Sequence, residues 1–471
     1  MKKILLIFCF TFFGLCQILS AQVKLPTFFS DHLVLQQKSN AKIWGTAIGK
    51  KKVKVHTSWD NKTYVTEPDD KGNWNVLTKT PEAGGPFQIN ISQENKILIK
   101  DVLIGEVWIC SGQSNMDMPV QGYHGLPITN SMDILMDAPD TMLRLFHVAR
   151  KSSEMPEMNV EGTWQLSDAA SASSFSAVGF QFASYLRKQL GVPIGIIQST
   201  WGGSPIEAWM DRAQVGDILK NRLSTNKAIT KAVHQTPGNL YNGMVAPLIG
   251  YNIAGVIWYQ GEQNRHNYND YLALQHAMVT SWRNQWGIGE WPFYITQLAP
   301  MKYAEHEAYK VPLLREAQLK LPDTLTNSGV AVIIDAGEEK NIHPAEKTLA
   351  AKRLAYLALA QTYNIKGFPK ASPTFKKMVV RNDTVSVQFN QIQLGLTTYG
   401  KPITQFEVAG GDQIFHPAKA VLQNNTLIVV SAQVKQPIAI RYAFKDWAVG
   451  ELYSVEGLPV SSFRTDNWLP K

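Results

Sequence analysis

The chain has 471 residues, of which 45% are hydrophobic and 18% charged, and its formal net charge is +8. This composition is that of an ordinary globular protein with enough apolar material for a buried core, and it excludes a low-complexity chain. The basic excess is spread along the sequence and is densest only at residues 50–52, so no nucleic-acid partner is expected. At roughly 150 residues per domain, the length predicts about three domains.

Residues 1–21 have the pattern of a secretory signal peptide. Two lysines precede an apolar run over residues 4–19, and Ser20 begins a group of small residues that suits cleavage. The alternative is an N-terminal anchor helix. No later stretch is apolar over the ~18 residues that a membrane span needs. We therefore expect an exported bacterial protein, periplasmic or extracellular, with no membrane span in its mature chain and with an oligomeric state that the sequence leaves open.

Cysteine usage agrees with this expectation. Cys9 and Cys16 lie in the expected signal peptide, and Cys110 then remains alone. The mature chain therefore cannot form an internal disulfide. Export without disulfides favours a bacterial periplasm or surface over a small extracellular disulfide scaffold.

The first and last parts of the mature chain are predicted to be β structure. Residues 22–104 contain alternating stretches such as 52–56 and 87–91, separated by turn signals, and this pattern is typical of a β-sandwich. The β pattern returns over 370–471, where Asn424 and Asn425 mark a turn between two strands. The sequence leaves open whether the two β segments form one module.

Residues 105–369 have a different hydrophobicity pattern, in which continuous apolar runs alternate with amphipathic stretches. Helices are expected near 180–190, ended by Gly191, and near 346–363. Alternation of this kind predicts an α/β domain with a mostly parallel sheet and helices on both faces. The apolar runs expected to form the sheet are 107–109, 194–197, 256–259, 293–295 and 330–334.

Small and polar residues follow each of these runs. In an open parallel sheet, ligands bind beyond the carboxyl ends of the strands, so these residues are expected to converge on one site. In chain order they are Ser114; Gly202 and Gly203; Gln260, Glu262 and Asn264; Thr296 and Gln297; and Asp335 and His343.

A serine hydrolase needs a nucleophile, a base and donors for an oxyanion. Ser114 lies in a glycine-containing turn and is a candidate nucleophile, although a serine there also suits a helix N-cap. Met116 stands where the GxSxG elbow of the α/β-hydrolases requires glycine, so that motif is absent. His343 is a candidate base, but a His-Pro pair also has purely structural uses.

Four residues are candidates for stabilising an oxyanion. Gly202 and Gly203 could present backbone N–H groups, or could form a plain turn. Gln260 or Asn264 could add a side-chain donor, although Gln260 could instead be a buried amide that satisfies backbone groups. Glu262 could orient its neighbours. No metal or other cofactor is expected, because the sequence has no HExxH motif and no Cys/His cluster.

These stretches resemble the sialate O-acetylesterase family, within the SGNH-type hydrolases. The resemblance covers nearly the whole mature chain, and its motifs are FSDHLVLQ (29–36), GEVWICSGQSNM (105–116), VPIGIIQSTWGGSPIEAW (192–209), NLYNGMVAPL (239–248), VIWYQGEQN (256–264), IHP (342–344) and GLPVSSFRTDNW (457–468).

The resemblance implies three domains: a β-sandwich domain over 22–104, an SGNH-type catalytic α/β domain over 105–369 with a parallel sheet flanked by helices, and a β domain over 370–471. It also implies removal of O-acetyl groups from sialic acids or sialoglycans. In that family role, the nucleophile would be Ser114 and the base His343. The oxyanion hole would be the Ser114 N–H, a Gly202 or Gly203 N–H and the Gln260 side chain, with Asn264 as a weaker candidate.

Two positions depart from the family pattern. Many relatives carry aspartate where this chain has Asn341, and a neutral amide stabilises the imidazolium less than a carboxylate does. The site is therefore either a Ser–His dyad, or Asp335, Glu338 or Glu339 supplies the acid. Gln263 stands where relatives usually have a small residue, which could alter the pocket wall.

Two other functions remain open. The same machinery would serve an acetylesterase for xylan or another plant polysaccharide, with Trp201, Trp209 and Trp258 either lining a sugar platform or lying in the core. The Asn341 substitution also leaves room for a non-catalytic glycan-binding protein that has kept the fold.

Overall fold

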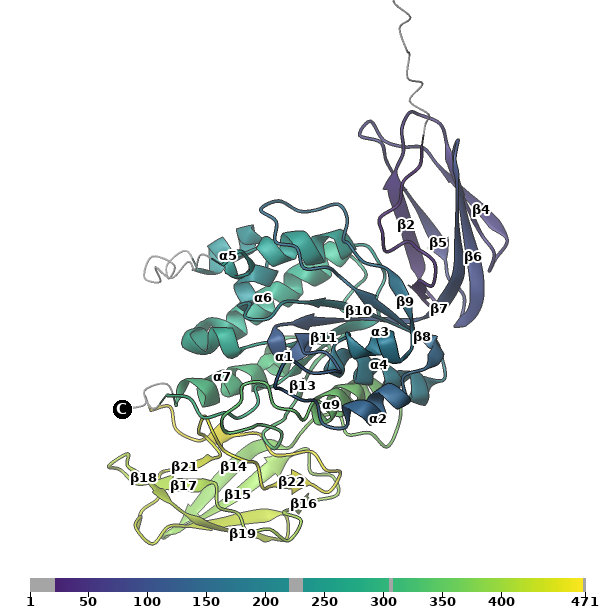
Figure 1. Ribbon diagram of the computed structural model, residues 1–471. Helices are drawn as coiled ribbons and strands as arrows, with labels where there is room; N and C mark the ends of the chain where they lie inside the picture. The colour runs from purple at the N-terminus through teal and green to yellow at the C-terminus, as the bar shows by residue number, and fades with distance from the viewer. Residues whose placement is uncertain (1–21, 220–231, 305–307, 469–471) are drawn as a thin grey trace, which may run out of the picture.

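The computed structural model describes residues 22–219, 232–304 and 308–468. The expected signal peptide therefore lies outside the described residues. Figure 1 shows a central α/β domain with a β module at each of two opposite ends, so the two β segments are separate modules. Among the described helices, none has the length and apolarity that crossing a membrane would require.

The N-terminal module has two β layers that share one core. A two-stranded sheet pairs β2 with β5, and the facing layer joins β4, β3, β6, β7 and β1. Alternating residues such as Ile43, Val55 and Ile91 are fully buried between the layers, as the period-two pattern predicted. The strands are β1 (Val34–Gln36), β2 (Asn40–Thr46), β3 (Val53–Thr57), β4 (Lys62–Thr66), β5 (Asn73–Lys79), β6 (Gly84–Ser92) and β7 (Lys96–Gly112).

Strand β7 belongs to both the N-terminal module and the central domain. Its first half pairs with β6 and β1, and residues 106–112 pair with β10 and β11. The expected domain boundary at 104/105 therefore falls inside one continuous strand. Every residue of β7 is buried from Val102 onward, three residues before the sequence pattern changes at Gly105.

The central sheet has the order β13-β12-β11-β7-β10-β8-β9. All neighbouring pairs are parallel except β8 and β9, which are antiparallel. The expected parallel sheet is thus a mixed one, because the chain returns along its own edge after β8. Its remaining strands are β8 (Asp140–His147), β9 (Trp164–Ser167), β10 (Ile194–Thr200), β11 (Gly255–Tyr259), β12 (Phe293–Thr296) and β13 (Ser328–Ala331).

Helices cover both faces of this sheet, as expected from its continuously apolar strands. Trp108 and Cys110 of β7 face a core shared with α4 and α9, whereas Val107 and Ile109 face one shared with α6 and α7. Gly191, with φ of 69°, ends α4 in the predicted position. The helices are α1 (Ser114–Asp117), α2 (Ser131–Met136), α3 (Ala169–Ser173), α4 (Ala177–Leu190), α5 (Arg212–Leu219), α6 (Tyr268–Trp286), α7 (Lys310–Leu319), α8 (Leu321–Thr324) and α9 (Thr348–Leu357).

The C-terminal module packs two antiparallel sheets, β14-β15-β20-β19 and β18-β17-β21-β23, with a small β16-β22 pair. Asn424 and Asn425 form the predicted turn between β19 and β20, with φ of 47° and 61°. The strands are β14 (Thr374–Arg381), β15 (Thr384–Asn390), β16 (Leu396–Thr397), β17 (Phe406–Ala409), β18 (Phe415–Pro417), β19 (Lys419–Gln423), β20 (Thr426–Val430), β21 (Ala439–Tyr442), β22 (Tyr453–Ser454) and β23 (Phe463–Arg464).

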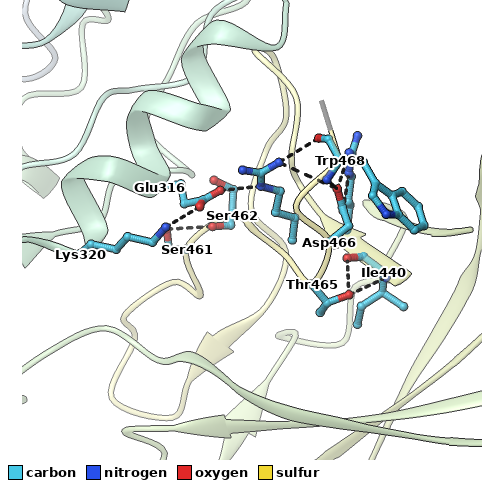
Figure 2. Close-up of polar contacts among 10 residues, drawn as sticks. Glu316, Lys320, Ile440, Ser461, Ser462, Thr465, Asp466 and Trp468 are labelled. Atoms are coloured by element: carbon cyan, nitrogen blue, oxygen red, sulfur yellow. Dashed lines mark hydrogen bonds and ion pairs between the residues drawn. The ribbon is translucent and has the colours of Figure 1, made fainter. Parts of the chain in front are cut away.

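Polar contacts join this module to the central domain. Arg464 Nε donates to Glu316 Oε2 of α7 at 2.7 Å. Figure 2 shows Lys320 reaching the same Glu316 carboxylate, at a distance of 2.6 Å. A second contact runs from the Gly450 N–H to the Ile334 carbonyl at 3.1 Å. The module therefore supports the loop that follows β13, which carries His343.

Candidate active site

Ser114 stands at the point where β7 ends and α1 begins. Gly112 ends the strand with φ of 135°, and a Cβ added there would lie 2.2 Å from the Tyr259 carbonyl oxygen. Only glycine allows the chain to turn this closely against β11. The turn continues with the Gln113 N–H donating to the same carbonyl at 3.1 Å, which leaves Ser114 as the first residue of α1.

The structure brings His343 to Ser114 across 229 residues of sequence. His343 Nε2 lies 2.8 Å from Ser114 Oγ, within hydrogen-bond distance. The Tyr123 ring packs edge-on against the imidazole at 5.8 Å. Burial, together with the positive charge of Lys347, holds the pKa of His343 below its ordinary value. The imidazole is therefore neutral at pH 7, the form that can accept a proton from Ser114.

Asn341 holds the backbone of His343 rather than its ring. Its Oδ1 accepts the His343 N–H at 3.0 Å, and its Nδ2 donates to the His343 carbonyl at 2.8 Å. The same Nδ2 donates to Glu338 Oε2 at 3.0 Å, and Glu338 Oε1 accepts the Ala345 N–H at 2.6 Å. This arrangement clamps the loop on both sides of the histidine.

The other candidate acids lie elsewhere. Asp335 forms a bidentate pair with Arg353, at 2.6 and 2.7 Å, and Glu339 pairs with Lys302 at 3.4 Å. Within the described ranges, the His343 ring has no carboxylate within 4.0 Å. Among the alternatives left open by the sequence, the geometry is that of a Ser–His pair.

The glycine turn after β10 lies beside Ser114. The Ser114 N–H is at the start of α1 and has no acceptor within that helix. A Cβ added to Gly202 would lie 3.3 Å from Ser114 Cβ, so the Gly202 backbone contacts the serine directly. Gly203 follows with φ of 71°, and its carbonyl accepts from Gln235 Nε2 at 2.9 Å. Gly202 is thus placed beside the candidate nucleophile, and Gly203 is the next residue along the turn.

Gln260 is a correction to the sequence-based prediction. Its Nε2 lies near three acceptors, and its Oε1 accepts from the Tyr271 hydroxyl at 2.8 Å. The side chain is fully buried, because α6 and the residue 204 turn enclose this strand end. Because both the nitrogen and the oxygen of this amide are already hydrogen-bonded within the protein, Gln260 supports the strand end and is not free to bind an oxyanion. The three acceptors of Nε2 are Asn264 Oδ1 (2.7 Å), Gln113 Oε1 (3.1 Å) and the Ser204 carbonyl (3.2 Å).

Asn264 is likewise a structural amide. It is buried, donates from Nδ2 to Glu207 Oε2 at 2.8 Å and accepts the Ile206 N–H on Oδ1 at 2.8 Å. These bonds fix the short helix η1 (Ile206–Trp209), which follows the two glycines. The residue therefore supports the glycine turn and does not face the reacting pair.

A buried charged network lies beneath Ser114 and His343. Two of its members, Asn115 and Lys347, were not among the candidates named from the sequence. Asn115 Oδ1 accepts from Lys347 Nζ at 2.6 Å, and its Nδ2 donates to both Glu262 and the Ile342 carbonyl, the latter at 2.9 Å. Burial raises the pKa of Glu262 and lowers that of Lys347 to about 7. Glu262 contacts the Asn115 side chain, and its expected part in orienting neighbours stays a prediction. The only signal for Lys347 was its place four residues after His343.

The three tryptophans considered for a sugar platform separate into two groups. Trp209 and Trp258 are fully buried in the core. Trp201 is partly exposed, stacks on His234 with ring centroids 5.4 Å apart, and lies 6.0 Å from the Arg150 guanidinium. In the described part of the chain, no group of three or more His, Cys, Asp or Glu side chains is arranged to hold a metal ion.

Comparisons with known proteins agree with this geometry. Residues 104–358 match the family model for carbohydrate esterase, sialic acid-specific acetylesterase. Sialate O-acetylesterase from Rattus norvegicus is 27% identical over 90% of both chains, and that from Homo sapiens is 27% identical over 75% of this chain and 74% of its own. The crystal structure of a carbohydrate acetylesterase from Xanthomonas citri superposes with a TM-score of 0.87 at 34% identity, covering 95% of this chain and all of that one.

The family match spans more than half of the chain and includes the turn of Ser114, both glycines and His343. It thereby confirms the resemblance drawn from the motifs, and it makes the protein a carboxylic ester hydrolase. The chain belongs to the sialic acid-specific acetylesterase family of carbohydrate esterases.

Proposed function

We propose that this protein is a sialate O-acetylesterase that hydrolyses O-acetyl esters of sialic acids, such as the 9-O-acetyl ester, on an SGNH-type domain. The observation that carries the chemistry is the 2.8 Å contact between His343 Nε2 and Ser114 Oγ. The family model and the sialate O-acetylesterases that resemble the chain support the substrate class. The signal-like pattern of residues 1–21 supports an exported enzyme.

The mechanism has two half-reactions. His343 Nε2 takes the Ser114 proton while Oγ attacks the acetyl carbonyl carbon, and the resulting oxyanion accepts hydrogen bonds from the backbone N–H groups of Ser114 and Gly203, with Gly202 adjacent. Collapse of this intermediate breaks the ester bond, and His343 returns the proton to the departing sugar oxygen. A water molecule, deprotonated by His343, then attacks the acetyl carbonyl carbon of the acetyl-enzyme. The bond from that carbon to Ser114 Oγ breaks, His343 returns the proton to Oγ, and acetate leaves.

The test is acetate release from 9-O-acetyl-N-acetylneuraminic acid and from acetylated xylan. Ser114→Ala should lower turnover by at least about a thousandfold without changing the fold. Ser174→Ala, at an exposed serine after α3, is the matched control and should remain active. Turnover by Ser114→Ala near that of the wild type would refute the mechanism.

Two outcomes would favour the rival functions. Release from xylan alone would keep the mechanism and replace the substrate by a plant polysaccharide. No acetate release from either substrate, together with no labelling of Ser114 by a serine-reactive phosphonate, would favour a glycan-binding protein without catalytic activity.

A further inference from the structure

Arg150 is a half-exposed cation beside the reacting pair that the mechanism does not use. Its side chain is 49% exposed, yet one end is fixed, because Nη2 donates to Asp117 Oδ2 at 2.6 Å. Asp117 is only 4% exposed and also accepts from the Thr200 hydroxyl at 2.6 Å and from the Tyr123 hydroxyl at 3.0 Å. The carboxylate thus has three donors, and the guanidinium has a firm anchor.

The guanidinium retains most of its hydrogen-bonding capacity. Of its five N–H donors, the described residues engage only the one on Asp117. The Trp201 ring lies 6.0 Å from the guanidinium carbon and is held in turn by its stack on His234. An arginine held on two sides loses little further side-chain entropy when it binds an anion.

This cluster of Asp117, Tyr123, Arg150 and Trp201 borders the reacting atoms. Asp117 ends the helix that Ser114 begins, and the Tyr123 ring packs on the imidazole of His343. Trp201 precedes Gly202, which contacts Ser114. The guanidinium and the partly exposed indole ring are therefore held by residues that adjoin Ser114 and His343, where a sugar with its acetyl group at Ser114 would bind.

We propose that Arg150, held by Asp117 and Trp201, binds the carboxylate of an acidic sugar and so selects acidic over neutral acetylated glycans. A planar guanidinium pairs with a carboxylate through two parallel hydrogen bonds, and an indole ring suits the apolar face of a sugar. The inference rests on the proposed function for the position of the acetyl group. It goes beyond that function by assigning the group that distinguishes a sialic acid from a neutral sugar.

The test measures binding of sugar acids by calorimetry in the Ser114→Ala background, so that its result does not depend on turnover. N-acetylneuraminic acid and D-glucuronic acid are each compared with their neutral methyl esters. With Arg150 present, at least one acid should bind about ten- to a hundredfold more tightly than its ester. Arg150→Met should abolish this difference, and Arg150→Lys should keep only part of it. Arg381→Met, at an exposed arginine of β14, is the control and should change nothing.

The outcomes separate this inference from the substrate assignment. Preference for glucuronic acid alone, lost in Arg150→Met, would support carboxylate binding while overturning the assignment to sialic acid. Equal binding of each acid and its ester, or a preference that survives Arg150→Met in a protein with native circular dichroism, would overturn the role of Arg150 whatever the enzyme hydrolyses.

Discussion

Replacing Asn341 by aspartate would place a second carboxyl group beside Glu338, and we expect this change to destabilise the protein. The Asn341 Nδ2 donates to Glu338 Oε2 at 3.0 Å and to the His343 carbonyl at 2.8 Å. In Asn341→Asp, an oxygen takes the place of that nitrogen. Two carboxylates would then face each other, and the His343 carbonyl would lose its donor.

The size of the effect follows from the geometry. Two unit charges about 3 Å apart repel by about 5 kcal/mol at an effective dielectric constant of about 20. Taking up a proton at pH 7 on a carboxyl group with a pKa near 4 costs about 4 kcal/mol, so the pair would bind a proton instead. Because Asn341 and Glu338 are partly exposed, solvent screening reduces this cost, and we expect a loss of about 2–4 kcal/mol in the free energy of unfolding.

Urea denaturation at pH 7 and pH 5 tests this reasoning. The carboxyl pair in Asn341→Asp has a raised pKa in the folded state, so the folded protein binds more protons than the unfolded chain between about pH 4 and pH 7. Stability relative to wild type should therefore fall as the pH rises, and most of the deficit should disappear at pH 5. The Glu338→Gln/Asn341→Asp double variant should recover most of it at pH 7. An Asn341→Asp protein as stable as wild type at pH 7 would refute the Glu338 contact.

Three further predictions concern the surroundings of the reacting pair. Lys347→Met removes the positive charge that helps to lower the pKa of His343, so the acidic limb of the kcat/KM profile should move to higher pH; a limb that stays in place would contradict that coupling. Gly202→Ala places a Cβ 3.3 Å from Ser114 Cβ and should lower kcat by about tenfold or more with little change in Tm, and unchanged kcat would mean that the glycine turn tolerates displacement. Gln260→Leu leaves the buried Ser204 carbonyl and Tyr271 hydroxyl without this hydrogen-bond partner, so the free energy of unfolding in urea should fall by about 2–4 kcal/mol. A variant with native stability and a selective loss of kcat would instead indicate an oxyanion role for this amide.

Sequence reasoning predicted that these candidate residues would meet, because one geometric rule sufficed. The carboxyl ends of parallel strands lie at the same edge of a sheet, so residues that follow different strands meet there. Ser114 follows β7, Gly202 and Gly203 follow β10, and His343 follows β13. Their convergence depends only on the order of strands and helices, which the apolar runs revealed.

The roles of the amides could not be predicted in the same way. A polar residue after a strand is exposed or buried according to what covers that strand end. Tyr271 on α6 covers Gln260, and Glu207 on η1 covers Asn264. The local sequence does not show that Tyr271 or Glu207 will bury these amides, because the positions of both residues depend on how the helices pack over the sheet. The burial of Lys347 is hidden for the same reason.

Among the residues that the structure describes, no carboxylate contacts His343, and this separates two tasks that a triad acid performs together. One task is orientation, and here backbone clamps perform it: Asn341 holds both the N–H and the carbonyl of His343, and Asn115 holds the Ile342 carbonyl. The other task is stabilising the imidazolium, and no carboxylate of the described residues contacts the ring to do so; burial and the charge of Lys347 oppose it. In the mechanism that we propose, His343 is therefore a well-placed neutral base, and the backbone donors of Ser114 and the glycine turn have the larger part in stabilising the transition state.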